Sequence, residues 1–371
     1  MNATGLRIGL IGPLPPPSGG MANQTLQLAT LLRGEGATVE VIQVNRPYHP
    51  LWIGKVQGVR ALFRLLPYLT HLWRSAGSVQ LFHVMANSGW SWHLFAAPAI
   101  WIARFRGIPV VVNYRGGEAD TFLGKALFWV KPSLDRTDAI IVPSGFLDAV
   151  FAKHGVSTEV VPNIINLSRF SAGDARSSAE RGGPCLLVAR NLEPIYDNAT
   201  ALRAFSLVQG TFPAARLTIA GSGPELSALK KIADELGLTQ SVTFTGRVDN
   251  EGMAALYRQA DIMINASLVD NMPNSVLEAL ASGVTVVSTN VGGVPYLVEH
   301  EKTALLVPPQ DPKAMAEAIL DLLNNPIKSS KIQQAGMESV QQYAWPQVRN
   351  RLLQVYEKVL AKKNNPLVRP T

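Results

Sequence analysis

The sequence predicts an α/β protein of two domains, each built on a parallel sheet wound with helices on both faces. A chain of 371 residues with 47% hydrophobic residues can bury a large core, and its length favours two domains over one. Short apolar segments alternate with stretches of helical spacing along both halves. A polar segment rich in Gly and Ser, residues 171–183, separates the halves and is predicted to be a linker.

The first half, residues 1–170, is expected to contain five buried strands. The first strand ends in a loop rich in Gly and Pro, and a helix then begins at Gly19 and Gly20 and ends at Gly34. Each of the other strands is a run of apolar and β-branched residues. The expected strands are Leu6–Gly12, Val39–Val44, Val79–Val84, Pro109–Asn113 and Ala139–Val142.

The second half, residues 184–344, repeats this plan with six expected strands. A helix should follow the fourth of them, because Pro273 suits a first helical turn and Gly283 stops the apolar pattern that begins at Val276. The segment that follows, about residues 345–362, is amphipathic and is expected to form a terminal helix. The expected strands are Cys185–Ala189, Arg216–Ala220, Val242–Thr245, Ile262–Asn265, Thr285–Ser288 and Ala304–Val307.

Composition narrows the possible partners and the location. The net charge is +7, and residues 1–180 carry 16 Lys and Arg against 10 Asp and Glu, whereas the remainder carries 18 against 17. No basic tract, zinc pattern or aromatic RNA-binding motif accompanies this excess, which argues against nucleic acid and favours an anionic membrane surface or lipid phosphate. The N-terminus lacks a secretory pattern, and a single cysteine, Cys185, fits a reducing cytosol. A cytoplasmic protein, possibly peripheral at the inner face of a membrane, is expected.

Residues 55–74 form a basic amphipathic stretch. At 100° per residue, one arc holds Arg60, Arg64, His71 and Arg74, and the opposite arc holds Leu62, Leu66, Leu69 and Trp73. The pattern suits a helix on an anionic bilayer, in which Arg60, Arg64, Trp73 and Arg74 face the membrane or acceptor side. It suits equally a helix packed on the sheet with a solvated basic face. Pro67 is expected to break or kink the helix.

Polar residues that could bind a phosphorylated ligand follow the strands of the second half. Arg190 comes directly after a strand, so its side chain should project from the carboxyl end of that strand. Gly221 and Gly223 follow the next strand and would let the backbone approach a phosphate. Asp270 and Glu278 flank the start of the helix near Pro273, where free N–H groups favour a phosphate or a sugar hydroxyl.

These segments resemble retaining glycosyltransferases with the GT-B fold, of the family 4 type. The resemblance covers nearly the whole chain and is most specific from Cys185 to Val307. It implies two Rossmann-like domains facing a cleft, a C-terminal helix that crosses back to the first domain, and transfer of a sugar from a nucleotide sugar to an acceptor hydroxyl. The acceptor would be a glycan or a lipid-linked molecule, in the synthesis of a cell-envelope polysaccharide, lipopolysaccharide or glycolipid.

The resemblance also implies roles for single residues. Arg190 would bind the donor diphosphate, Glu278 the ribose hydroxyls, and Asp270 the sugar. The donor would also be contacted by Gly19, Gly20, Gly221, Gly223, Arg247, Asn271, Met272, Pro273, Asn274 and Ser275. In the first domain, Arg115 could bind a phosphate and Glu118 an acceptor hydroxyl; alternatively, these two residues form a structural salt bridge.

Three positions depart from the family's pattern. Ile195 replaces a lysine that usually follows the arginine by five residues, Arg115 occupies the usual histidine position, and Asp270 replaces a glutamate. Two alternatives therefore remain, a non-catalytic nucleotide-sugar-binding homologue and a GT-B sugar-nucleotide epimerase. Neither metal nor cofactor is expected, because the sequence has no Asp-x-Asp motif and its six histidines form no ligand-spaced cluster.

Overall fold

The computed structural model describes residues 3–16, 19–47, 59–173 and 182–364, with side chains in the second helix given from Phe63 onward. Contacts divide the chain into two compact units. Unit 1 comprises Met1–Ile164 and Trp345–Thr371, and unit 2 comprises Ile165–Ala344. The division falls at Ile164, earlier than the predicted end of the first domain at residue 170, and most of the predicted linker lies outside the described residues.

Unit 1 is built on a parallel six-stranded sheet in the order β2-β1-β3-β4-β5-β6. The strands are β1 (Arg7–Gly12), β2 (Thr38–Gln43), β3 (Leu81–Ala86), β4 (Val110–Tyr114), β5 (Ala139–Val142) and β6 (Glu159–Val160). Every residue of β3 and β4 is buried, as expected for central strands that carry helices on both faces. The sequence did not predict β6, because two residues are too few to show a pattern.

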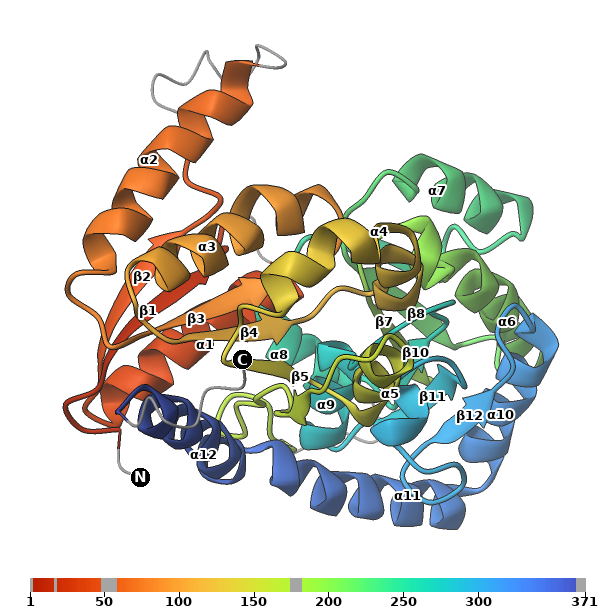
Figure 1. Cartoon of the computed structure of the whole chain (residues 1–371). Coiled ribbons are helices and arrows are strands. Elements are labelled where there is room, and N and C mark those ends of the chain that lie inside the picture. Colours follow the sequence, from red (N-terminus) through yellow and green to blue (C-terminus); the bar gives the residue numbers. More distant parts are fainter. Residues whose placement is uncertain (1–2, 17–18, 48–58, 174–181, 365–371) are drawn as a thin grey trace. The chain divides into compact units, whose positions relative to one another are not determined.

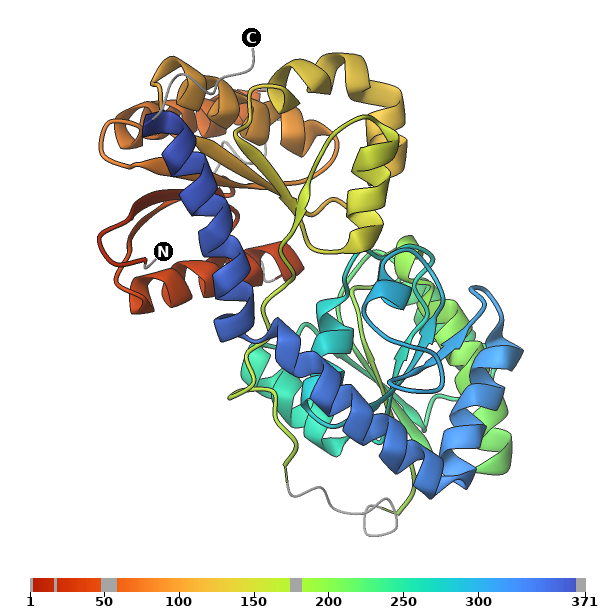
Figure 2. The same cartoon turned by 60° about the horizontal axis from the view of Figure 1, so that its bottom comes forward.

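Helices cover both faces of this sheet (Figures 1 and 2). On one face lie α1 (Gly20–Gly34) and α12 (Trp345–Asn364). On the other lie α2 (Val59–Ser75), the π-helical turn η2 (Trp92–Ala96), α3 (Ala97–Phe105), α4 (Ala119–Leu134) and α5 (Gly145–Lys153). Pro67 lies inside α2 and does not break it, contrary to one of the two predicted outcomes.

The C-terminal helix α12 is fixed to unit 1 by apolar and polar contacts. Leu352 and Tyr356 are buried in the same cluster as Leu28 of α1. At the start of α12, Trp345 Nε1 donates to Glu35 Oε1 at 2.9 Å, and Arg349 Nη1 donates to the same carboxylate at 3.0 Å. The hydrogen bond from Arg349 lowers the pKa of Glu35, so this carboxylate is charged at neutral pH and holds α12 against the end of α1.

Unit 2 repeats the architecture with a second parallel six-stranded sheet, in the order β12-β11-β10-β7-β8-β9. Its strands are β7 (Cys185–Ala189), β8 (Arg216–Ala220), β9 (Val242–Gly246), β10 (Ile262–Asn265), β11 (Thr285–Thr289) and β12 (Leu305–Val307). Its helices are η3 (Pro194–Tyr196), α6 (Asn198–Thr211), α7 (Leu226–Glu235), α8 (Asn250–Gln259), α9 (Asn274–Ala281), η4 (Val294–Tyr296), α10 (Pro312–Asn324), α11 (Pro326–Ser339) and η5 (Val340–Tyr343). The predicted fold class, parallel sheets with helices on both faces, is confirmed.

The helix α9 ends as its sequence predicts. Gly283 has a φ of +68°, in the left-handed region that glycine adopts without strain. Its N–H donates to Leu280 O at 3.1 Å, and the N–H of Val284 donates to Ala279 O at 2.9 Å. These two bonds satisfy the last carbonyl groups of the helix and turn the chain into β11. The start differs slightly, because Pro273 lies just before the first turn rather than within it.

Candidate functional site

Arg190 is the centre of a polar cluster at the carboxyl ends of the central strands of unit 2. It directly follows β7, which lies between β10 and β8. Its Nε donates to Oδ1 of Asn265, the last residue of β10, at 3.0 Å, and its Nη2 donates to Ser267 Oγ at 3.0 Å. The same guanidinium forms an ion pair with Asp270, and about 11% of the Arg190 side chain and 12% of the Asp270 side chain are exposed. The fold thus brings together two of the predicted site residues.

The aromatic ring of Tyr196 completes the surroundings of Arg190. The guanidinium carbon lies 4.4 Å from the centre of this ring, a geometry in which the cation is attracted by the π-electrons. Tyr196 belongs to η3, as does the residue before it, Ile195. The N–H of Leu268 donates to the carbonyl oxygen of Ile195 at 2.8 Å. The position where relatives would carry a lysine therefore joins the loop after β7 to the loop after β10.

Glu278 lies in α9 beside this cluster. Its Oε2 lies 3.1 Å from the hydroxyl of Tyr257, which also lies 3.1 Å from the carbonyl oxygen of Ser275. Burial raises the pKa of Glu278 to about 7, against the opposing effects of the Tyr257 hydrogen bond and the positive charges of Arg190 and Arg169. Both protonation states of this carboxyl group are therefore populated at neutral pH.

A buried hydroxyl group in the same helix as Glu278 makes no hydrogen bond to the described residues of unit 2. Ser275 Oγ is buried in the first turn of α9 and has no hydrogen-bond partner among the described residues. Pro273, the residue before α9, provides no side-chain cap for the first N–H groups of the helix. A hydroxyl or phosphate oxygen of a ligand could satisfy such groups.

Glycines hold the loops of this cluster in contact. Gly293 N donates to Asp270 O at 2.7 Å, and a Cβ atom at Gly293 would overlap the carbonyl group of Asn271. On the other side, a Cβ at Gly221 would overlap the carbonyl group of Arg190. A Cβ at Gly223 would overlap the carbonyl group of Leu192. Glycine is therefore required at these positions by the close approach of two backbone segments, whether or not a ligand binds there.

The remaining predicted donor residues of unit 2 differ in position. Asn271 and Met272 are buried in the loop before α9, and Asn274, its first residue, is half-buried. Arg247 is exposed and follows β9, the strand at the edge of the sheet. No contact between Arg247 and the Arg190 cluster is found among the described residues. Sequence reasoning missed Asn265, Ser267, Tyr196 and Tyr257; a polar residue that ends an apolar strand, as Asn265 does, is the signal that could have indicated the first of them.

Unit 1 carries its own predicted residues at the carboxyl ends of its strands. Arg115 follows β4, and its side chain donates to Oδ1 of Asn113 at 3.1 Å and to Oδ1 of Asn163. The side-chain amide nitrogen of Asn113 lies 3.1 Å from Nε2 of His83, and Nδ1 of His83 lies 2.7 Å from the hydroxyl of Tyr356. Because the amide donates to Nε2, His83 carries its proton on Nδ1 and donates to Tyr356. A buried polar chain thus links Arg115 to α12.

The charges of this chain are set by burial. Burial lowers the pKa of His83 to about 3, with a smaller contribution from the charge of Arg115, so the imidazole is neutral at physiological pH. Burial also lowers the pKa of Arg115 to about 10, which leaves the guanidinium charged. Glu118 is exposed and precedes α4.

The first glycine of the pair at the start of α1, Gly19, is not required by the shape of the turn. Gly19 has a φ of −169°, extended backbone that any residue adopts, and a Cβ atom there would meet open space. Gly20 is the first residue of α1, and no side chain caps the N-terminus of this helix. The absence of a side chain at Gly19 therefore leaves room for another molecule near the free N–H groups.

The residues predicted to face a membrane lie on α2, but with an unexpected orientation. Leu66 and Trp73, from the predicted apolar arc, are 54% and 49% exposed, whereas His71 is half-buried and lies 3.0 Å from Glu40 on β2. The prediction that the apolar arc packs on the sheet is therefore wrong for Leu66 and Trp73. Arg64 is half-buried and Arg74 is exposed; the side chain of Arg60 lies outside the described residues.

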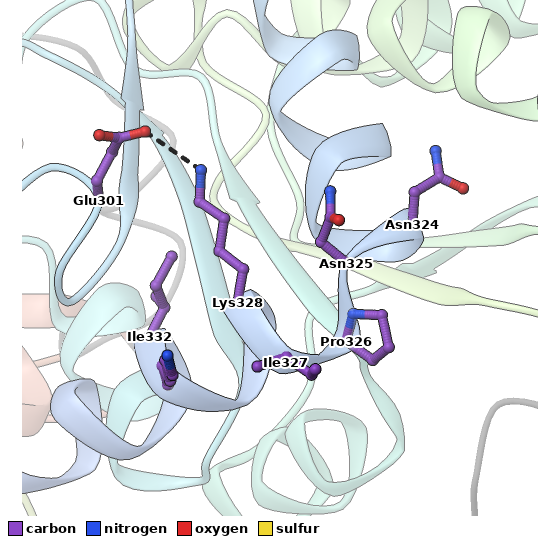
Figure 3. A pocket seen from close by; sticks show the side chains of 8 residues that line it. Glu301, Asn324, Asn325, Pro326, Ile327, Lys328 and Ile332 are labelled. Atoms are coloured by element: carbon purple, nitrogen blue, oxygen red, sulfur yellow. Dashed lines mark hydrogen bonds and ion pairs between the residues drawn. The ribbon is translucent and has the colours of Figure 1, made fainter.

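A pocket on unit 2 is unrelated to the Arg190 cluster. It is lined by Glu301 and by residues where α10 meets α11, and Figure 3 shows Lys328 pointing toward Glu301, with Nζ 3.2 Å from Oε1. Asn324 ends α10, the helix that runs back from the carboxyl end of β12, so the pocket lies toward the opposite edge of the sheet. Of the two lysines that line it, Lys328 and Lys331, the first is paired with Glu301 and Asp321.

The described ranges contain neither a candidate metal site nor a candidate membrane span. No group of three or more His, Cys, Asp and Glu side chains there could hold a metal ion. Among the helices of the same residues, none combines the length and apolarity needed to cross a bilayer.

Models of two glycosyltransferase families match adjoining parts of the chain. The model described as Glycosyltransferase Family 4 matches residues 18–169, and the model described as Glycosyl transferases group 1 matches residues 174–339. A phosphatidyl-myo-inositol mannosyltransferase of Mycobacterium leprae is 26% identical over 95% of this chain and 97% of its own length. A D-inositol 3-phosphate glycosyltransferase of Streptomyces avermitilis is 28% identical over 55% of this chain and 47% of its own length.

Solved structures show the same fold. Sucrose-phosphate synthase from Thermosynechococcus elongatus superposes with a TM-score of 0.77 at 22% identity, covering 96% of this chain and 99% of that chain. The Anabaena protein HepE, solved in complex with UDP, superposes with a TM-score of 0.75 at 17% identity over 95% of this chain and 100% of that chain. The family models and the fold together show that this chain is a glycosyltransferase with the GT-B fold and belongs to the family 4 type.

Proposed function

We propose that the chain is a retaining enzyme that transfers a sugar from a nucleotide-sugar donor to an acceptor hydroxyl group. The observation that carries this proposal is the convergence of Arg190, Asp270 and Glu278 at the carboxyl ends of the central strands of unit 2. Parallel sheets of this kind bind nucleotides at that edge. The structural neighbour HepE, solved with UDP and with UDP-glucose, supports a donor of this class.

Arg190 would stabilise the charge that develops on the departing diphosphate. Breaking the bond between the anomeric carbon and the phosphate oxygen leaves negative charge on the nucleoside diphosphate, and a fixed cation lowers the energy of that transition state. The guanidinium of Arg190 forms an ion pair with Asp270. A diphosphate would compete for the guanidinium and leave the carboxylate of Asp270 to accept hydrogen bonds from sugar hydroxyls.

The new glycosidic bond would form on the face of the sugar that the diphosphate leaves. The acceptor oxygen then bonds to the anomeric carbon, and its proton passes to a phosphate oxygen of the leaving group, so no protein base is needed for this step. Glu278 would accept hydrogen bonds from the ribose hydroxyls. Its pKa of about 7 makes this interaction depend on pH, because only the carboxylate form accepts through both oxygens.

The acceptor proposed is a lipid-linked or glycan molecule of the cell envelope, reached at the cytoplasmic face of the membrane. Two relatives support this class, since one is a phosphatidyl-myo-inositol mannosyltransferase and another is a GDP-mannose-dependent phosphatidylinositol monomannoside mannosyltransferase. In unit 1, Arg115 would bind a phosphate of donor or acceptor, and exposed Glu118 an acceptor hydroxyl. The basic side chains of α2 would add attraction to an anionic surface.

A thermal-shift panel of UDP, GDP, ADP and dTDP sugars tests the donor class. A bound donor raises the unfolding temperature by mass action, so the correct base and sugar should give the largest shift. The expected result is a shift in the parent chain that Arg190→Ala and Glu278→Gln both lose. Transfer or hydrolysis of that donor, with product configuration read by NMR, follows. No shift with any sugar nucleotide, or an inverted anomeric product, would contradict the proposal.

A further inference from the structure

Aromatic side chains occupy the outward faces of helices in unit 1, where a helix facing water normally carries polar residues. Phe128 and Trp129 of α4 are 80% and 73% exposed, and Phe105 at the end of α3 is 73% exposed. The opposite face of α4 buries Leu123 and Val130 in the core, so α4 has a second apolar face besides the one that packs on the sheet. Single exposed apolar residues need no explanation, but a group on adjacent helices indicates an interaction surface.

These aromatic residues lie on helices that adjoin one another. Helix α3 packs against both α2 and α4, and Figure 1 shows the three helices over one face of the first sheet. Two arginines bridge them, since the guanidinium of Arg106 lies 4.9 Å from the Trp73 ring and that of Arg136 lies 4.1 Å from the Trp101 ring. We call this group the α2–α4 surface. It comprises Phe63, Leu66, Trp73, Arg74, Trp101, Arg104, Phe105, Arg106, Phe128, Trp129 and Arg136.

The positive charge of the chain is concentrated in the same segment. Residues 59–136 carry nine Lys and Arg against three Asp and Glu, a net charge of +6 that equals the whole excess of residues 1–180. Two of the three acidic side chains are already paired, Asp120 with Lys153 at 3.0 Å and Asp135 with Lys131 at 2.8 Å. The aromatic residues are therefore set in a strongly basic surround.

We propose that the α2–α4 surface lies on an anionic lipid bilayer, with Phe105, Phe128 and Trp129 inserted among the headgroups. Indole and phenyl rings favour the interface between headgroups and acyl chains. Arginine guanidinium groups bind lipid phosphates, and each basic residue near an anionic surface adds attraction. A protein partner would not need this excess of positive charge, whereas a bilayer rich in anionic lipid matches both features.

This orientation would bring the proposed acceptor residue close to the membrane. Glu118 directly precedes α4, and Phe128 follows it by ten residues, which corresponds to about 15 Å along a helix. A headgroup that protrudes from the bilayer could span such a distance. The inference rests on the proposed lipid-linked acceptor for its purpose, but vesicle binding can be measured without any donor or acceptor.

Co-sedimentation of the full chain with vesicles of phosphatidylglycerol and phosphatidylcholine tests the proposal. We expect binding at low salt that weakens with added salt and with vesicles of phosphatidylcholine alone. The double variant Phe128→Ser/Trp129→Ser should bind at least about tenfold more weakly. The double variant Arg104→Gln/Arg136→Gln should bind about thirtyfold more weakly, at about 1 kcal/mol for each arginine. Ile327→Ser and Arg203→Gln, exposed positions of unit 2, serve as matched controls and should bind like the parent.

A second measurement reports on α4 directly. Brominated phosphatidylglycerol quenches tryptophan fluorescence on contact, and Trp129→Phe should lose a measurable part of this quenching while it still binds vesicles. Three results would overturn the proposal: no binding to anionic vesicles, binding indifferent to both double variants, or a loss of self-association in the serine variant that identifies a second copy as the occupant. Donor affinity, measured by calorimetry, should be unchanged in all these variants, which separates failure of this surface from failure of the donor site.

Discussion

The carboxyl group of Glu278 should make the stability of unit 2 depend on pH. Its pKa is about 7 in the folded chain, against an ordinary value of 4.5, and the gap between these values corresponds to about 3 kcal/mol. Between the two values the unfolded chain has released the proton while the folded chain retains it, so the free energy of unfolding falls as pH rises. This penalty is nearly absent at pH 4.5 and is complete above pH 7.

Replacing Glu278 by glutamine removes the charge and keeps the shape and the hydrogen bond to Tyr257. The variant should differ from the parent by less than about 1 kcal/mol at pH 5 and be more stable by about 3 kcal/mol at pH 8. For a unit of this size the difference at pH 8 corresponds to a rise of about 6–12 °C in the melting temperature. A residue that binds donor would thus reduce the stability of the empty protein, as binding sites often do.

The assay is calorimetric unfolding of the full chain between pH 5 and pH 8, with the unit 2 transition identified by the donor that shifts it. The matched control is Glu317→Gln, an exposed carboxyl group in α10 that should change stability little at any pH. The reasoning is refuted if Glu278→Gln gives no stabilisation at pH 8, or the same stabilisation at pH 5 as at pH 8.

Three further predictions follow from the geometry of unit 2. Ile195→Lys should tighten nucleoside diphosphate binding by about 1.5–3 kcal/mol in titration calorimetry, because the backbone of this residue joins the loops beside Arg190. Unchanged affinity would show that the side chain at this position faces away from the ligand. Gly293→Ala should reduce donor affinity and melting temperature, since its Cβ would overlap the carbonyl group of Asn271, whereas Gly124→Ala in open space on α4 should not; equal effects of the two would count against this packing argument. Sugar transfer should persist in EDTA, and activity restored only by a divalent metal would contradict the role given to Arg190.

The sequence was sufficient to predict the fold because the central strands of both sheets are buried on both faces. Such strands are continuous apolar runs, and Cys185–Ala189 and Ile262–Asn265 were predicted with the bounds that the structure shows. Gly283 marked the end of α9 for a local reason, its positive φ. These features depend on short segments and can therefore be predicted without knowledge of the tertiary structure.

The contacts of Arg190 could not be predicted in the same way. Its position after β7 was clear, but its partners Asn265, Ser267 and Tyr196 come from segments that only the strand order brings together. Strand order depends on tertiary packing rather than on local pattern. The sequence thus indicated where Arg190 lies, at the carboxyl end of β7, but not the groups that hold its side chain.

The orientation of α2 shows a different limit of sequence reasoning. The helix has apolar residues on more than one side, and the pattern alone does not say which side packs on the sheet. Tyr68 and Leu72 are buried, while Leu66 and Trp73 face outward. His71 turns toward Glu40 because an acidic partner is available on β2. The outward apolar residues became evident only from the packing, and they extend to α3 and α4.

Titration calorimetry of UDP and GDP with the full chain tests the central claim, that the Arg190 cluster binds the diphosphate of the donor. The parent chain should bind one of the two nucleotides, and Arg190→Ala should weaken that binding by about 1.5–3 kcal/mol, the loss of a charged hydrogen bond. Arg216→Ala, an exposed arginine at the opposite end of β8, should leave it unchanged. Equal binding by Arg190→Ala and the parent, or an equal loss in Arg216→Ala, would contradict the account.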